Sequence, residues 1–219
     1  MSAIPELAGR FSSLYTGALT DVLDRYGHLQ QTLPPELLPL RPGMRLAGPA
    51  YPILGRPHPG HDYDASIRKI LEMLGSVTAG SVAVYQTNDR ISAHLGELSV
   101  TSLASRGCAG AVIDGGARDA EYILREGFPV FSRYVTPQDC VPRWELLGHG
   151  DVTVVIGGVR IAPGDWIVGD VDGIVVVPGE QVEEILVDAE AKVATENEIR
   201  DAVRAGTLPL DAYERFGTF

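Results

Sequence analysis

The sequence predicts a mixed α/β protein, with βαβ units in its first half and β-hairpins in its second. Two observations predict this class. Between residues 81 and 136, short apolar runs alternate with amphipathic stretches, as in parallel strands joined by helices. Between residues 151 and 178, apolar runs are joined by Gly-Gly, Pro-Gly and Asp-Gly pairs, which favour tight hairpin turns.

In the first part of the chain, apolar residues recur at helical spacing in two segments, and Gly27 can end the first of them. The expected elements there are a helix over 5–27, a proline-punctuated connection over 34–43, a strand over 44–54 interrupted by prolines, and an amphipathic helix over 64–77.

The alternation that follows sets the next elements, and Gly127 can end the last of the helices. These are a strand over 81–87, a helix over 95–107, a strand over 109–114, a helix over 116–127 and a strand over 128–136. Residues 151–178 then hold at least three β-rich runs, and a long acidic helix covers about 179–205. Because this half leaves the alternation, a doubly wound nucleotide fold is not expected.

Length and composition indicate one globular domain over residues 1–219, with 45% hydrophobic and 21% charged residues. The formal net charge of −11 disfavours nucleic acid as a partner, because phosphate binding needs clustered Lys and Arg. A small anionic substrate is still compatible, because salt screens distant charges and one local Arg can dominate a site.

No signal for export or membrane insertion is recognisable. The first fifteen residues lack the basic and apolar regions of a secretory signal, and no run reaches the roughly 18 apolar residues of a membrane span. Cys108 and Cys140 are the two cysteines, too few for a disulfide framework or a four-cysteine zinc site. We therefore expect a cytoplasmic protein without membrane contact.

The stretch AGAVIDGGARDAEYILREG, residues 109–127, is the first candidate site. A strand is expected to end at Asp114. Gly115 and Gly116 permit positive φ and close backbone approach. The next helix is expected to begin near Ala117, and its free N–H groups and dipole favour an anion.

Arg118 and Asp119 stand at that helix start. Arg118 offers a fork of donors suited to a carboxylate, and Asp119 offers the hard oxygen ligand that Mg²⁺ accepts. A plainer interpretation is equally open, because turn chemistry alone explains the glycines. In it, Asp119 interacts with the helix start and Arg118 pairs with a surface acid.

The second candidate is HLGELS, residues 94–99, at the strand–helix junction one unit earlier. In parallel strands both junctions lie at the same sheet edge, where ligands bind in open α/β sheets. The segment would offer N–H groups toward Arg118, with Glu97 facing the metal side, from Gly96, Glu97, Leu98 and Ser99. The alternative is an ordinary helix start stabilised by a Glu in its first turn.

Glu97, followed after twenty residues by Arg118 and Asp119, resembles the RraA-like family. That family contains class II 4-hydroxy-4-methyl-2-oxoglutarate / 4-carboxy-4-hydroxy-2-oxoadipate aldolases and the RraA regulators of ribonuclease E. The resembling blocks are TGALTDVLDRYG, GELSVTSLASRGCAGAVIDGGARD, GDWIVGDVDGIVVVP and ATENEIRDAVRAGTLPLDAY. The resemblance implies a layered α/β/β/α sandwich of the swivelling β/β/α type. It also implies a trimer or hexamer, with the helix over about 179–205 at a subunit interface.

The resemblance also implies roles for the residues. The turn from Gly96 to Ser99 would bind the pyruvyl carboxylate of a 2-oxo acid through backbone N–H groups. Arg118 would contact the keto oxygen and stabilise an enolate. Asp119 would bind a divalent metal partly through waters, Mg²⁺ first, with Mn²⁺ or Co²⁺ as alternatives. A carboxylate from a neighbouring subunit's last helix would reach the site, and Glu196 fits best, with Glu198 next.

In one respect the sequence departs from the family pattern, because characterised aldolases carry Asp where this chain has Glu97. Glu is one methylene longer and can still hold a metal-bound water, so the departure bears on the preferred substrate. The proton of the substrate's C4 hydroxyl would go to Glu97 through water, or to Glu196 of a neighbour.

The implied reaction is cleavage of a 4-hydroxy-2-oxo acid, such as 4-hydroxy-4-methyl-2-oxoglutarate, to pyruvate. Oxaloacetate decarboxylation passes through the same enolate. One alternative is a non-catalytic, RraA-type regulator that binds an RNA-degrading enzyme. Another, which the departure at Glu97 leaves open, is an aldolase-like scaffold recruited to a different enolate reaction. Glu97, Arg118 and Asp119 together favour the enzyme, because a regulator has no need of them. The sequence does not name the aldehyde or ketone half of the substrate.

Histidines elsewhere receive plainer interpretations. His58, His61 and Asp62 fit no strong metal motif, and Asp62 or Asp64 is expected to cap the next helix. His94 stands two residues before Gly96 and could support the site from behind, but a packed or solvent-facing histidine is the preferred interpretation.

Overall fold

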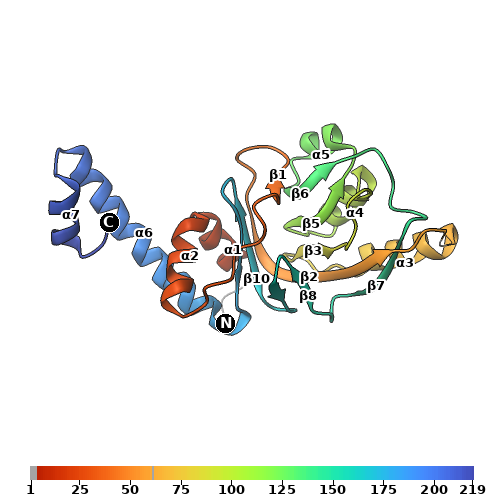
Figure 1. Ribbon diagram of the computed structural model, residues 1–219, viewed down its shortest axis with the longest axis horizontal. Coiled ribbons are helices and arrows are strands. Elements are labelled where there is room, and N and C mark those ends of the chain that lie inside the picture. Colours follow the sequence, from red (N-terminus) through yellow and green to blue (C-terminus); the bar gives the residue numbers. More distant parts are fainter. Residues whose placement is uncertain (1–3, 61) are drawn as a thin grey trace.

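The structure is a computed structural model that describes residues 4–60 and 62–219 (Figure 1). Its helices are α1 (Ile4–Ser12), α2 (Thr16–Arg25), α3 (Tyr63–Ser76), α4 (Glu97–Ser105), α5 (Ala120–Glu126), the 3₁₀ turn η1 (Gly179–Gln181), α6 (Val182–Arg204) and α7 (Pro209–Phe216). Its strands are β1 (Leu38–Pro39), β2 (Leu46–Pro57), β3 (Val82–Gln86), β4 (Ala93–Leu95), β5 (Gly110–Ala117), β6 (Val130–Val135), β7 (Trp144–His149), β8 (Val154–Ile156), β9 (Val159–Ile161), β10 (Trp166–Asp170) and β11 (Gly173–Val177).

Three apolar cores separate four layers. One core lies between α3, α4, α5 and the outer face of β3 and β5. A second lies between the two halves of the folded sheet, with β3, β5 and β6 facing β10 and β11. The third lies between β10, β11 and helices α1, α2 and α6. Figure 1 shows the two groups of helices on opposite flanks of the strands. The predicted α/β/β/α sandwich is therefore confirmed.

A single strand, β2, joins the two halves of the sheet. It pairs antiparallel with β10 through Pro49 and parallel with β3 from Ala50 onward. The strand is continuous over 46–57, so the expected interruption by prolines is wrong. Pro49 stands where the strand changes partner, and there a residue without an N–H costs least.

The parallel core of the large sheet has the order β6-β5-β3-β2. The parallel pairing of β3, β5 and β6 within it is the βαβ arrangement that the alternation between residues 81 and 136 predicts. Strands β4 and β7 and the short β1 were not expected. β4 has only three residues, and three residues show no periodicity. The late segment holds four strands, in agreement with the expected minimum of three, because Gly157 and Gly158, both at positive φ, turn β8 back into β9.

Each end of the chain holds one helix more than expected. The helix expected over 5–27 is two helices, which residues 13–15 separate. The long final helix is confirmed as α6, and a further short helix, α7, follows it. Figure 1 shows the far half of α6 together with α7 extending beyond α1 and α2, away from the sheet. Among helices in residues 4–60 and 62–219, none is long and apolar enough to cross a membrane.

The histidine-containing loop before α3 behaves as its sequence indicates. Asp62 caps the helix, because its Oδ1 accepts the Ala65 N–H at 2.7 Å. His58 instead pairs with Glu145 across the loop, at 3.0 Å. His61 lies outside the described residues.

A buried carboxylate connects the start of α2 to the β10–β11 hairpin. Asp170 is only 4% exposed. Its two oxygens accept the Thr16 N–H at 2.9 Å and the Thr16 hydroxyl at 2.8 Å, and Arg45 lies 3.6 Å away. A buried polar group whose partner is removed loses its hydrogen bonds and keeps its desolvation cost. Asp170 therefore ties the third core together across the chain.

Replacing this carboxylate should destabilise the fold without touching the rest of the sheet. We expect Asp170→Ala to lower the free energy of unfolding by about 2 to 3 kcal/mol, because it leaves the Thr16 N–H and hydroxyl without an acceptor and removes a helix cap. Urea unfolding followed by circular dichroism measures the loss. The control is Asp172→Ala in the same hairpin, at an exposed position, which should change stability by less than about 0.5 kcal/mol. Equal losses in both variants would contradict the role of Asp170.

Candidate functional site

A cavity of about 290 Å³ opens at the carboxyl ends of β4 and β5. Both strand–helix junctions singled out in the sequence reach it, because β4 pairs parallel with β5. All the predicted site residues except Glu196 line it, namely Gly96, Glu97, Leu98, Ser99, Arg118 and Asp119. The expected meeting of the two junctions at one sheet edge is therefore present.

The glycines before Arg118 do not form the expected turn. Strand β5 continues through Gly115 and Gly116 to Ala117, and neither glycine has a positive φ. Both are needed for close approach instead. A Cβ at Gly115 would lie 2.7 Å from the Thr87 hydroxyl, and one at Gly116 would lie 2.5 Å from the Tyr134 ring. The glycines let neighbouring strands and side chains crowd against β5.

The turn itself falls on Asp119, which has φ of +56° in the left-handed region. Helix α5 accordingly begins at Ala120, not near Ala117. The backbone conformation directs the Asp119 carboxylate toward the preceding junction, where Oδ2 accepts the Glu97 N–H at 3.1 Å. Asp119 thus serves the N-terminus of α4, which has no cap from its own residue Gly96.

Arg118 is held between two carboxylates. Its backbone N–H donates to the Leu95 carbonyl at 2.9 Å, which fixes the start of the side chain at the strand edge. Nε lies 3.7 Å from Asp119 Oδ2 and Nη2 lies 3.3 Å from Asp139 Oδ2. A Cβ at Gly96 would come within 2.7 Å of Asp119 Oδ2 and 3.1 Å of Arg118 Nε. Position 96 must therefore be glycine for this arrangement to exist.

Asp139 was missed in the sequence. It follows β6 as Arg118 and Asp119 follow β5, in a segment that pairs with Ala93 through N–H bonds of 2.7 and 3.1 Å. Its Oδ1 accepts the Val141 N–H at 3.3 Å, so its carboxylate is fixed from both ends. Extending the carboxyl-edge rule to the third parallel strand would have identified it.

Of the two glutamates proposed as bases, Glu97 lines the cavity and Glu196 does not. The carboxylate of Glu97 lies along its own helix and accepts the Thr101 hydroxyl at 3.4 Å, while its N–H meets Asp119. Glu196 is on α6, bound to Lys192 at 2.9 Å, and is not among the residues that line the cavity. Within one chain, then, neither Glu196 nor the exposed Glu198 joins the site.

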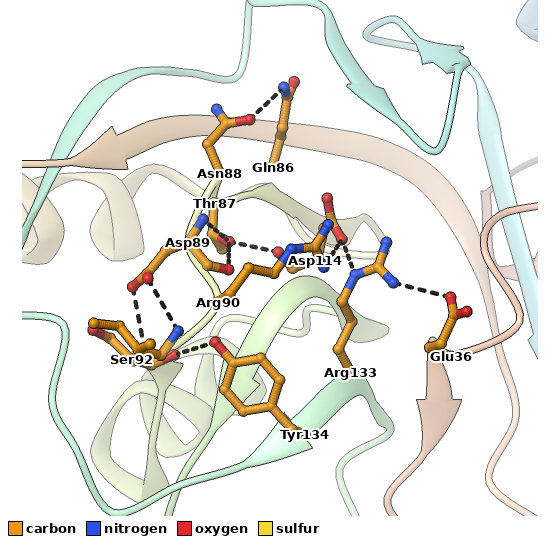
Figure 2. Close-up of polar contacts among 11 residues, drawn as sticks. Glu36, Gln86, Thr87, Asn88, Asp89, Arg90, Ser92, Asp114, Arg133 and Tyr134 are labelled. Atoms are coloured by element: carbon orange, nitrogen blue, oxygen red, sulfur yellow. Dashed lines mark hydrogen bonds and ion pairs between the residues drawn. The ribbon is translucent and has the colours of Figure 1, made fainter.

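The segment between β3 and β4 is fixed by polar contacts at the back of the site (Figure 2). The Thr87 hydroxyl donates to the Asp114 carbonyl. Asp89 accepts the N–H groups of Ile91 and Ser92 at 3.1 and 3.3 Å. These contacts set the position from which β4 leads into Gly96.

Two arginines flank the buried Asp114 side chain in the same cluster. Figure 2 shows Arg133 bonded both to Asp114 and to Glu36, the latter at 3.0 Å. Arg90 approaches Asp114 at 3.7 Å and is largely exposed. Every charge in this cluster has a partner, which is typical of a structural network rather than a second ligand site.

Comparison with known proteins gives a consistent result. The RraA-like family model, described as Aldolase/RraA, matches residues 16–176. A curated protein of Halalkalibacterium halodurans, named "Putative 4-hydroxy-4-methyl-2-oxoglutarate aldolase", is 30% identical over 207 residues. That match covers 93% of this chain and 91% of the relative.

Solved structures agree. An uncharacterized protein from Pseudomonas syringae pv. tomato superimposes with a TM-score of 0.83 at 29% identity, covering 95% of this chain and 96% of that one. RraAS2 of Streptomyces coelicolor, described as an unusual member of the RNase ES inhibitor RraA family, gives a TM-score of 0.80 at 29% identity. It covers 89% of this chain and 96% of its own.

His94 lines the cavity and is buried, so the packed interpretation is confirmed and the solvent-facing one is wrong. Its Nε2 lies 3.3 Å from the Asp89 carboxylate and its ring meets the Trp144 ring edge-on at 5.1 Å. Burial lowers the pKa of His94 to about 4, although Asp89 and Asp139 act in the opposite direction. The ring is therefore neutral at pH 7.

Acid should destabilise the protein through His94. An unfolded histidine has a pKa of about 6.5, above the folded value of about 4, so the unfolded state takes up the proton first. Stability that is present above pH 6.5 is lost as the pH falls toward 4. Between pH 7.5 and 5.5, urea unfolding should show a loss about 1 kcal/mol larger for the wild type than for His94→Gln. An NMR titration in which the His94 ring becomes charged near pH 6.5 would contradict the burial argument.

Proposed function

The chain belongs to the RraA-like family, and from its cavity we propose that it is a divalent-metal-dependent class II aldolase. It would cleave a 4-hydroxy-2-oxo acid and release pyruvate. The observation that carries the proposal is the convergence of a cation, a carboxylate and a helix N-terminus on one cavity: Arg118, Asp119 and the start of α4. The aldolase name of the Halalkalibacterium relative supports the same reaction class.

The substrate's 2-oxo carboxylate is assigned to the N-terminus of α4. A helix start offers N–H donors and the positive end of a dipole, both of which favour an anion. Glu97 already gives its N–H to Asp119, so the proposal relies on the next turn residues, Leu98 and Ser99. The side chain of Leu98 is 79% exposed and does not compete for this space.

The metal is assigned to Asp119. Its side chain is 44% exposed and offers a hard oxygen donor of the kind that Mg²⁺ takes, usually one or two carboxylates with several waters. Among residues 4–60 and 62–219, no group of three or more His, Cys, Asp or Glu is arranged to hold a metal ion. The proposed site therefore relies on fewer than three ligands from this chain, Asp119 being the one assigned, for Mg²⁺ or else Mn²⁺ or Co²⁺. Once bound, the ion would supply Lewis acidity to the oxo acid.

Arg118 is assigned the role of stabilising the negative charge that develops on the substrate. As the bond between C3 and C4 breaks, its electron pair moves into the enolate of pyruvate, and the guanidinium stabilises the oxygen that becomes negative. The C4 hydroxyl loses its proton to the base and becomes the carbonyl of the second product, and C3 of the enolate then takes up a proton to give pyruvate. Oxaloacetate would lose CO₂ through the same enolate.

The base is assigned to one of two glutamates. Glu97 could act through a water, since its carboxylate is held only by a long contact to Thr101. Glu196 could act from a neighbouring subunit, because the half of α6 that carries it extends away from its own cavity (Figure 1). The α7 end of the chain exposes large apolar side chains that a second copy could cover, namely Leu208, Leu210, Tyr213 and Phe219. We therefore propose a trimer or hexamer with shared sites.

The second candidate is a regulator that binds an RNA-degrading enzyme, and it comes from the description of the Streptomyces neighbour. A regulator needs a surface, not a cavity that holds Arg118 between carboxylates. The enzyme proposal explains why Gly96, Arg118 and Asp119 crowd together at strand ends, and the regulator proposal leaves that arrangement without a purpose.

Metal removal tests the proposed reaction. We expect the protein to release pyruvate from a panel of 4-hydroxy-2-oxo acids and from oxaloacetate, to lose this activity in EDTA, and to regain it with Mg²⁺ or Mn²⁺. A coupled lactate dehydrogenase assay measures the pyruvate. Asp119→Asn should stay inactive after metal is returned, while its circular dichroism matches the wild type. Full activity in EDTA would refute the metal assignment. If no acid in the panel yields pyruvate, the aldolase proposal is refuted and the regulator is the remaining candidate.

Subunit mixing tests the position of the base. Arg118→Ala and Glu196→Ala should each be inactive alone. After subunit exchange, part of the activity should return, because some interfaces then pair an intact Arg118 with an intact Glu196. Native mass spectrometry verifies the exchange. If exchange is complete and no activity returns, or if a fully active monomer is observed, Glu196 is excluded and Glu97 is the remaining candidate.

A further inference from the structure

We propose that Asp139 is a positioning residue, which holds the guanidinium of Arg118 in place for the enolate oxygen. The inference rests on the proposed function and deepens it. It names a carboxylate that acts on the reaction through Arg118, and that neither binds the metal nor touches the substrate.

Strand β4 fixes the backbone on both sides of this pair. The Arg118 N–H donates to the Leu95 carbonyl at 2.9 Å. Two residues earlier, Ala93 bonds to the chain on either side of Asp139, through its N–H at 2.7 Å and its carbonyl at 3.1 Å. Arg118 and Asp139 are therefore anchored to the same short strand, which sets the separation of their backbones.

The Asp139 side chain is fixed through both of its oxygens. Oδ1 accepts the Val141 N–H at 3.3 Å, and Oδ2 lies 3.3 Å from Arg118 Nη2. An arginine side chain has several rotatable bonds and loses much rotamer freedom when it is held in one place. Because Asp139 holds the guanidinium before the substrate arrives, this cost does not fall on the reaction.

Asp119 is less able than Asp139 to hold the guanidinium. Its Oδ2 lies 3.7 Å from Arg118 Nε, and the same oxygen accepts the Glu97 N–H at 3.1 Å. The divalent ion assigned to Asp119 would draw on that carboxylate as well, and its charge has the same sign as the guanidinium. Asp139 is therefore the carboxylate that can hold Arg118 while the metal is bound.

Two other roles for Asp139 predict different effects of replacing it. If Asp139 were a metal ligand beside Asp119, its replacement would weaken metal binding. If it were a purely structural group, it would act through the Val141 N–H, and Asn would serve as well because its amide oxygen is also an acceptor. Asp139→Asn removes the charge that faces Arg118 and keeps that acceptor, so it isolates the positioning role.

The kinetic experiment measures pyruvate release from 4-hydroxy-4-methyl-2-oxoglutarate at saturating Mg²⁺. A small displacement of a catalytic group costs up to about a hundredfold in rate, but the pair is partly exposed, at 36% and 35%, which weakens it. We expect Asp139→Asn to lower kcat by roughly tenfold and to change KM little, because the contact matters most in the transition state. Asp151→Asn removes an equal charge outside the cavity lining and should match the wild type.

Equilibrium binding separates positioning from metal ligation. Calorimetry with Mn²⁺ should give the same Kd for Asp139→Asn as for the wild type, whereas Asp119→Asn should bind the ion far more weakly. Oxalate resembles the enolate of pyruvate, because its second carboxylate places a negative oxygen where the enolate has one. In the metal-loaded protein, Asp139→Asn should therefore weaken oxalate binding several-fold and leave pyruvate binding nearly unchanged. Circular dichroism verifies the fold, and Asp139→Ser, with a shorter acceptor, repeats the comparison should the first variant misfold.

The contrary outcomes are distinct. Weaker Mn²⁺ binding by Asp139→Asn would overturn the inference and make Asp139 a metal ligand. An unchanged kcat, or equal losses in oxalate and pyruvate affinity, would overturn it and leave Asp139 a structural group. In these cases the wild type still releases pyruvate, so the proposed function stands. If the wild type releases none, the proposed function is refuted and this inference with it.

Discussion

The parallel pairing of β5 with β4 on one side and β6 on the other is the constraint on which the site depends. It brings three chain segments to one edge: the start of α4, the Arg118–Asp119 turn, and the segment that carries Asp139. Strand β5 is buried along its whole length, and its glycines permit the close spacing. A displacement of β5 would carry Arg118 and Asp119 together away from Asp139 and from the start of α4, so the site is as rigid as the sheet beneath it.

Much of this arrangement could be predicted from the sequence, for a physical reason. The alternation between residues 81 and 136 is local, and parallel strands must end at a common edge, so the meeting of residues 96–99 with Arg118 follows from pattern alone. The layered fold came from resemblance rather than periodicity. The three cores then explain it, because each strand face that carries apolar residues needs a covering layer.

What could not be predicted depends on long-range or conformational information. Gly115 and Gly116 indicate a turn in isolation, yet the strands on both sides keep them extended. The left-handed backbone at Asp119 suits an Asp better than most residues, but the sequence does not indicate which residue of the segment adopts it. The bond between Thr16 and Asp170 joins residues 154 positions apart, a separation that no local pattern reports. The approach of Asp139 to Arg118 differs in this respect, because the carboxyl-edge rule applied to β6 would have indicated it.

The separation of α6 and α7 from the layered body has an evolutionary consequence. Every residue that lines the cavity lies within the segment that the family model matches, residues 16–176, while both helices lie beyond it. Mutations in this terminal arm can accumulate without disturbing the strand edge that holds Arg118. Body and arm can therefore diverge at different rates. Lineages could remodel this arm while inheriting the same cavity at the strand edge.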